Sequence, residues 1–126
     1  FFKIKSELYN ELKQLIMEDK TVNLRGKEYT IKFPNVGEYY RIETMKQSLG
    51  RGFYNTLLGN STKAAQNALD IIDIEATLTV LMPELVKDLK VDSFNQLGLK
   101  DFAEIRKFYD TEVYPFLKEV HQILNQ

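Results

Sequence analysis

The first twenty residues carry apolar positions at the spacing of an amphipathic helix. Phe1, Ile4, Leu8 and Leu12 recur at three- and four-residue steps, with charged side chains between them. Such a stripe lies along one face of a helix. The pattern predicts a helix over 1–20 whose apolar face packs either on the rest of this chain or in a groove of a partner, and it does not choose between the two.

A period-two pattern follows the first helix. Two short runs alternate apolar with polar positions and flank the turn signal Arg25-Gly26-Lys27. Alternation is typical of strands, and a short connection containing glycine joins two strands in a hairpin. Pro34 has no N–H to donate and ends the second strand. We expect a β-hairpin over 21–34. The residues expected on one face of its second strand are Tyr29, Ile31 and Phe33.

Helical periodicity then continues through most of residues 36–126. Asn35 is expected to cap a helix over 38–49, because its side chain can accept a hydrogen bond from the first turn. Glycines interrupt the pattern before a short helix over 53–58. Since glycine commonly ends helices, we expect this short helix to end at Gly59.

The strongest helical pattern covers 62–82, where Asn60 or Ser61 is a candidate cap. Its two apolar stripes leave a narrow polar strip, which indicates a helix buried inside a bundle. Because the residue before a proline avoids helical geometry, Pro83 predicts a break, and a short helix resumes over 84–89. The residues of the polar strip are Gln66, Asp70, Asp73 and Thr77.

The last long helix is expected to begin near Lys100, after a loop or single turn over 91–98. A mid-helix proline costs about 3 kcal/mol unless the chain adjusts, so Pro115 predicts a bend around 111–114. One apolar stripe continues on both sides of that bend. Its residues are Phe102, Ile105, Tyr109, Val113, Phe116, Val120 and Leu124.

Length and composition are those of one folded domain. The chain has 126 residues, of which 44% are hydrophobic and 28% charged, a balance that supports a buried core. No apolar run approaches the roughly 20 residues that cross a bilayer, so no membrane association is expected. The elements together predict a single mainly helical α+β domain over 1–126. It would consist of a helical bundle over 36–126 with a small β-hairpin near its start.

Candidate chemistry is sparse. The chain has no cysteine and one histidine, which excludes thiolate nucleophiles, disulfides and clustered-histidine metal sites within one chain. Asp70 and Asp73 lie one helical turn apart, as paired acid–base or metal-binding carboxylates do, yet they also occupy the only polar strip of their helix. His121 has no serine or cysteine motif to activate. We therefore predict no enzyme activity, no metal and no cofactor.

Charge is divided unevenly along the chain. Residues 1–63 hold 11 Lys and Arg against 7 Asp and Glu, whereas residues 64–126 hold 6 against 11. Opposite surfaces of two copies could meet, or the basic hairpin could fold against the acidic half of its own chain. A nucleic-acid-binding accessory role is the alternative function. The residues that would carry that role are Lys20, Arg25, Lys27, Lys32 and Arg51.

Two segments resemble small tailed-bacteriophage proteins. The run from Lys27 to Glu43 reads strand, Phe-Pro, then a helix rich in Tyr, Ile and Glu, and Leu81-Met82-Pro83-Glu84-Leu85 is later followed by a Tyr-Pro-Phe helix. This order is similar to that of tail-assembly chaperones and virion accessory proteins over about residues 27–120. The resemblance implies a non-enzymatic structural or assembly role, in the virion or in the host cytoplasm during assembly.

Partners implied by that resemblance are other phage structural proteins, copies of this chain, or both. The contact would bury the apolar stripe of the first helix and pair opposite charges between subunits. The expected partner-binding residues are Phe1, Phe2, Ile4, Leu8, Leu12, Arg25 and Lys27.

Overall fold

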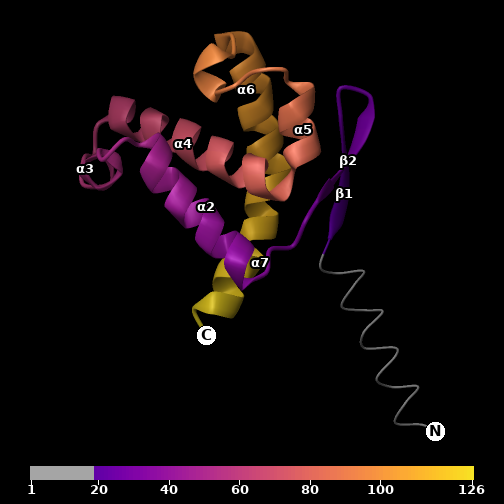
Figure 1. Cartoon of the computed structure of the whole chain (residues 1–126), viewed down its shortest axis with the longest axis horizontal. Helices are drawn as coiled ribbons and strands as arrows, with labels where there is room; N and C mark the ends of the chain where they lie inside the picture. The colour runs from indigo at the N-terminus through magenta and orange to yellow at the C-terminus, as the bar shows by residue number, and fades with distance from the viewer. Residues whose placement is uncertain (1–18) are drawn as a thin grey trace, which may run out of the picture.

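A computed structural model describes residues 19–126 (Figure 1). The predicted helix over 1–20 thus falls outside the described residues, apart from its last two positions. Of these, Lys20 begins a strand rather than ending a helix. The elements are β1 (Lys20–Leu24), β2 (Lys27–Ile31), α2 (Val36–Leu49), α3 (Tyr54–Leu58), α4 (Lys63–Leu81), α5 (Pro83–Asp88), the 3₁₀ turn η1 (Phe94–Gln96), α6 (Leu99–Phe108), the π turn η2 (Tyr109–Val113) and α7 (Tyr114–Leu124). The predicted mainly helical α+β fold is confirmed.

The β-hairpin is confirmed as an antiparallel pair in which Leu24 lies opposite Lys27. Its two-residue connection has left-handed backbone at both positions, with φ of 54° at Arg25 and 77° at Gly26. Two such residues make the turn whose twist matches that of the strands. The strand ends at Ile31, before the predicted position, because the next N–H bonds to the end of α4 rather than to β1.

Helix α2 begins at Val36, two residues before the predicted position, and its predicted cap is confirmed. The Asn35 side chain accepts the Glu38 N–H, and the Glu38 carboxylate accepts the Asn35 N–H. This reciprocal arrangement satisfies donors that a helix start leaves free. The short helix α3 ends at Gly59, as predicted.

Helix α4 runs through the middle of the molecule, in contact with α2, α3 and α5 (Figure 1). Its cap is Thr62 and not Asn60 or Ser61; Asn60 instead accepts the Thr62 N–H. The break at Pro83 is confirmed, since α4 ends just before Met82 and α5 begins at the proline. Thr77, expected in the polar strip, is only 2% exposed.

The predicted disturbance at Pro115 takes the form of a π turn between α6 and α7. The Tyr114 N–H donates to the Tyr109 carbonyl, five residues back. The wider turn accommodates a residue that has no N–H. The Thr111 hydroxyl donates to two carbonyl oxygens one turn earlier, at 3.0 and 3.2 Å.

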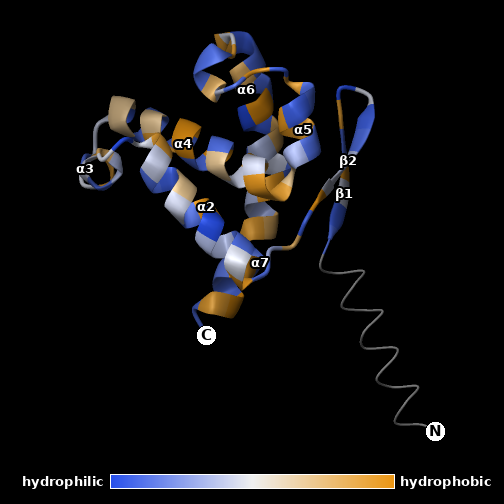
Figure 2. Ribbon diagram, viewed as in Figure 1, coloured by the Kyte–Doolittle hydropathy of each residue, from blue (hydrophilic) through white to orange (hydrophobic). Residues whose placement is uncertain are grey.

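One apolar core joins the hairpin to the helices (Figure 2). Ile31, Ile105 and Val113 are fully buried within it. The predicted stripe of the last helix is correct as far as Val120, but Leu124 is 51% exposed, because α7 extends past the elements that would cover its end. In residues 19–126, no helix combines the length and apolarity that crossing a membrane requires.

Candidate functional site

An apolar hollow on the described surface lies between the start of α2 and the end of α7. It has a volume of about 290 Å³. Its lining contains no charged residue, and Val36, Ile123 and Leu124 on its walls are 84%, 55% and 51% exposed. The residues that line this groove are Phe33, Pro34, Asn35, Val36, Tyr39, Val120, Ile123 and Leu124.

Local sequence fixes both walls of the groove. Pro34 ends the hairpin and Asn35 caps α2, so the chain turns sharply and places Val36 in the first turn of the helix. The Phe33 ring packs edge-on against Phe116 of α7, with ring centroids 5.4 Å apart. Tyr39 packs in the same way against His121, at 6.3 Å. These two aromatic pairs hold α2 and α7 on either side of the groove.

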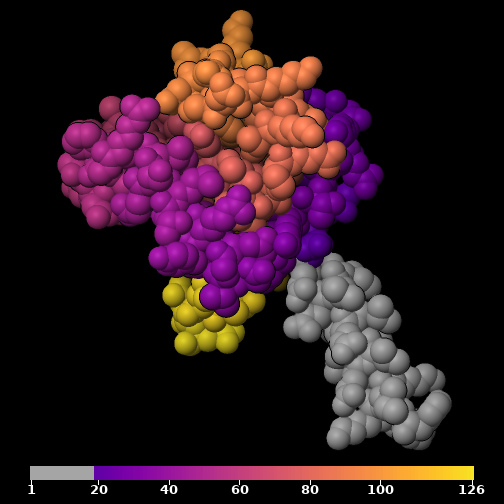
Figure 3. Space-filling view, viewed as in Figure 1, coloured from indigo at the N-terminus to yellow at the C-terminus, as the bar shows by residue number. Residues whose placement is uncertain are grey.

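The chain enters the described region next to this groove. The Asp19 carboxylate accepts the Phe33 N–H at 3.0 Å. Phe33 is itself a wall residue of the groove. Asp19, the first described residue, therefore lies next to a residue of the groove wall. Figure 3 shows the end of α7 below the start of α2.

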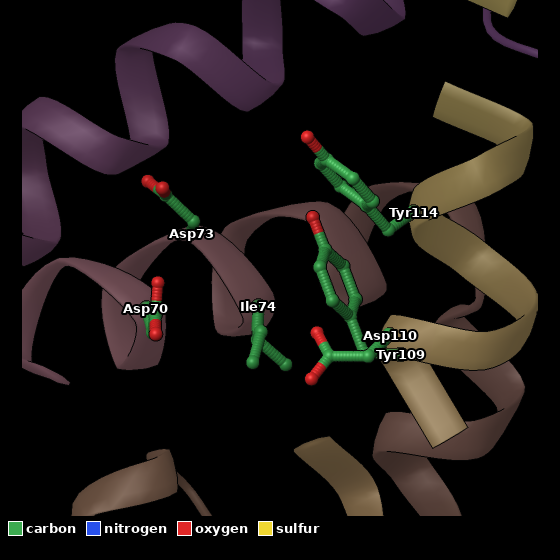
Figure 4. A pocket seen from close by; sticks show the side chains of 6 residues that line it. All are labelled: Asp70, Asp73, Ile74, Tyr109, Asp110 and Tyr114. Carbon is green, nitrogen blue, oxygen red and sulfur yellow. The ribbon is translucent and has the colours of Figure 1, made fainter. Parts of the chain in front are cut away.

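A second hollow, of about 300 Å³, holds the carboxylates that the sequence suggested as acid–base candidates. Asp70 and Asp73 of α4 face Tyr109 and Asp110 of η2 and Tyr114 of α7 (Figure 4). This hollow is called the acidic pocket below. Three carboxylates and two phenols would suit a cation or a proton-transfer site if they were free to act.

Asp70 and Asp73 are each engaged by neighbouring side chains. Arg106 donates to Asp70 at 2.6 Å. The Tyr54 hydroxyl donates to Asp73 at 2.9 Å, and the Lys46 ammonium lies 3.9 Å from the same oxygen. A carboxylate held in this way supports the packing of α3, α2 and α6 on α4 rather than presenting a free base.

Burial governs the proton affinities in the acidic pocket. It raises the pKa of Asp73, and the nearby Lys46 charge and the Tyr54 hydrogen bond oppose this. Burial also raises the pKa of Tyr109 to about 12, and the neighbouring Thr77 hydroxyl acts in the opposite direction. A phenol with that pKa stays protonated at neutral pH. Within residues 19–126, no three histidine or acidic side chains are grouped closely enough to hold a metal ion.

The structure describes two of the seven expected partner-binding residues, Arg25 and Lys27. Phe1, Phe2, Ile4, Leu8 and Leu12 lie outside the described residues. Arg25 forms two hydrogen bonds with Glu104, both at 3.0 Å, and a third with Asp101 at 3.1 Å. Lys27 pairs with Asp88 at 2.7 Å and with Glu84 at 3.0 Å. Arg25 and Lys27 are therefore both ion-paired within the chain.

The groove between α2 and α7 is not among the sites that the sequence predicts. Leu124 is expected in the apolar stripe of the last helix, and Val36 precedes the helix that the sequence predicts over 38–49. A signal existed, because Ile123 is an apolar residue outside the stripe that the sequence predicts to be buried. What the sequence lacked was the position of the hairpin exit against the end of α7.

Comparison with known proteins identifies no relative. No family model matches the chain, and neither a curated protein nor a solved structure matches it.

Proposed function

We propose that this protein is a non-enzymatic structural or assembly component of a tailed-bacteriophage particle, acting in several copies through protein–protein contacts. The observation that supports the contact is the uncharged groove between α2 and α7, whose apolar walls face solvent. Exposed apolar surface that forms a hollow is typical of a docking surface. The phage role itself is supported by the resemblance over residues 27–120.

The proposed contact places residues 1–18 of one copy in the groove of the next. The apolar stripe of that segment complements an uncharged lining, as an amphipathic helix does in a groove. Burying one leucine side chain completely contributes about 1.5–3 kcal/mol. Burying three or four such residues would offset only part of the entropy lost on association. This fits an assembly that needs many copies or a further partner.

Charge pairing between subunits has a smaller part in this proposal than the sequence suggested. Lys20, Arg25 and Lys27 pair with carboxylates of the second half of the same chain. Of the two arrangements left open by the charge distribution, the structure displays the intramolecular one. The same pairing leaves the hairpin less able to attract phosphate, so nothing in the geometry favours the nucleic-acid-binding alternative.

Assembly is tested by measuring mass with light scattering over a range of protein concentrations. The informative variant is Val36→Asp, which places a charge on the groove wall at a position 84% exposed. A carboxylate in the first turn of a helix is favourable for that helix, so the fold should persist. Gly37→Asp adds the same charge at the next position, outside the groove lining, and is the matched control.

We expect the unmodified chain and Gly37→Asp to gain mass as concentration rises, and Val36→Asp to stay smaller. If the unmodified chain is monomeric at every concentration, the same three proteins are mixed with the structural proteins of a candidate phage. Absence of any complex there, and of the protein from assembled particles, would contradict the proposed function.

A further inference from the structure

We infer that in the isolated molecule the groove between α2 and α7 is covered by residues 1–18 of the same chain. The groove would then become available to a neighbouring copy only when the two copies exchange this segment. The inference rests on the proposed function for the role of the exchange, but the self-covering contact can be tested without it.

The position of Asp19 is the first argument. Its carboxylate accepts the N–H of Phe33, a residue of the groove wall, at 3.0 Å. This bond joins two points that are 14 residues apart in sequence. The preceding segment therefore starts beside the groove and needs no long connection to reach it.

The length of the segment is the second argument. Ile16 precedes Asp19 by three residues, which span at most about 10 Å when extended. Leu12 precedes it by seven residues, which span about 10 Å when helical. Leu12, Leu15 and Ile16 are thus the apolar residues of the segment that the inference sets against the groove wall at Phe33.

Chemical match is the third argument. The groove lining has no charged residue, and the charges of residues 1–18 fall between the stripe positions. That segment holds three lysines and three glutamates. It is therefore neutral as a whole, and no net repulsion or attraction decides the contact. The apolar stripe is the part of the segment expected to pack against a lining without charges.

The segment's own groove is favoured over that of another copy by proximity. A site joined to its ligand by a short connection experiences an effective concentration in the millimolar range. A second copy in dilute solution is far less concentrated, so the contact within one chain forms first. At high local concentration the same contact can form between copies, because exchanging an identical element has a low cost.

The test uses pairs of engineered cysteines in the full chain, which has no cysteine of its own. Gln14→Cys is combined with Gln122→Cys, beside Ile123 on the exposed side of α7, and treated with a short bismaleimide at low micromolar protein. The control pair is Gln14→Cys with Thr56→Cys in α3, which packs on α4 away from α7 (Figure 1). Gels and mass spectrometry separate cross-links within one chain from those between chains.

We expect the 14–122 pair to cross-link within the monomer and the 14–56 pair to do so far less. Adding Val36→Asp should lower the 14–122 yield about tenfold, the change that a modest cost of desolvating a carboxylate produces. Gly37→Asp should leave the yield unchanged.

Equal yields for the two pairs, no cross-link, or cross-links only between chains at low micromolar protein would each overturn the inference. The outcomes also separate it from the proposed function. A chain that assembles but does not cross-link within its monomer retains the function and loses the self-covering contact. A chain that cross-links within its monomer and never assembles retains the self-covering contact and loses the proposed function.

Discussion

Asp73 of α4 shows how one carboxylate links three elements of the fold. It accepts a hydrogen bond from Tyr54 of α3 and lies 3.9 Å from the ammonium of Lys46 of α2. Burial raises its pKa because the charged form loses hydration. The hydroxyl and the ammonium recover part of that loss, so the side chain holds α2 and α3 against α4 at an electrostatic cost.

The raised pKa of Asp73 predicts a specific pH dependence. The folded chain binds this proton more tightly than the unfolded chain, whose aspartates have a pKa of about 3.9. The contribution of Asp73 to the free energy of unfolding is therefore largest below that value and is lost as pH rises through the folded-state pKa. Asp73→Asn should remove this decline, which urea unfolding at a series of pH values would measure.

Glu38→Gln is the control of opposite sign. The hydrogen bond from Lys32 and the bond with Asn35 lower the pKa of Glu38. Its stabilising contribution is present above the unfolded pKa of about 4.3 and is lost as pH falls through the folded value. The interpretation of Asp73 would be wrong if the two variants changed the pH profile in the same direction.

Thr77 is a residue whose exposure the sequence predicted wrongly. Its spacing on α4 places it with Gln66, Asp70 and Asp73, and a threonine among polar residues indicates a solvated face. In the structure its side chain is buried, beside Tyr109, whose pKa it lowers. The sequence could not show this, because Tyr109 lies more than 30 residues away.

At the scale of single elements, the start of α2 determines the shape of the groove. The Asn35 side chain accepts the Glu38 N–H at 2.8 Å, and the Glu38 carboxylate accepts the Asn35 N–H at 3.1 Å. These bonds begin the helix at Val36 and direct that residue into the groove wall. Loss of the cap would weaken the helix start and the groove together.

Asn35→Ala should lower the free energy of unfolding by about 1 kcal/mol, the usual cost of losing an N-cap. Asn67→Ala is the matched control, because Asn67 is exposed in the interior of α4 and alanine is the better helix former there. We expect it to leave stability unchanged or to raise it. Chemical denaturation followed by circular dichroism measures both, and equal losses would contradict the capping role.

Most elements were predictable because their signals are local. The two strands, the cap of α2, the end of α3 at Gly59 and the break at Pro83 all depend on residues within a few positions of each other. The π turn at Tyr109–Val113 was predictable in place but not in form. Proline requires some adjustment of the helix, and the packing of Tyr109 and Val113 in the core decides which adjustment occurs.

At the scale of the whole molecule, ion pairs fasten the hairpin to the second half of the chain. Arg25 reaches α6, Lys27 reaches α5 and Lys20 reaches η2. These side chains are 37–65% exposed, so each pair contributes little by itself and is weakened by salt. Together they set the position of the hairpin beside α5 and α6.

Arg25→Ala should therefore cause a small loss of stability at low salt that shrinks as salt is added. Lys100→Ala is the control, because Lys100 is exposed in the first turn of α6 and makes no ion pair with a carboxylate of residues 19–126. Thermal unfolding at low and high salt measures the effect. If Arg25→Ala and Lys100→Ala responded identically to salt, the fastening of the hairpin by Arg25 would be refuted.

The sequence was enough to predict the mainly helical fold, the hairpin near its start and most of the places where helices begin and break. It could do so because caps, turns and apolar periodicity act over a few residues. Three other features become visible only in the folded chain. Asp70 and Asp73 are held by Arg106 and Tyr54. The hairpin cations are paired within the chain, and Phe33, Val36 and Ile123 line one groove. Those outcomes depend on which distant side chains meet, and no local pattern records that.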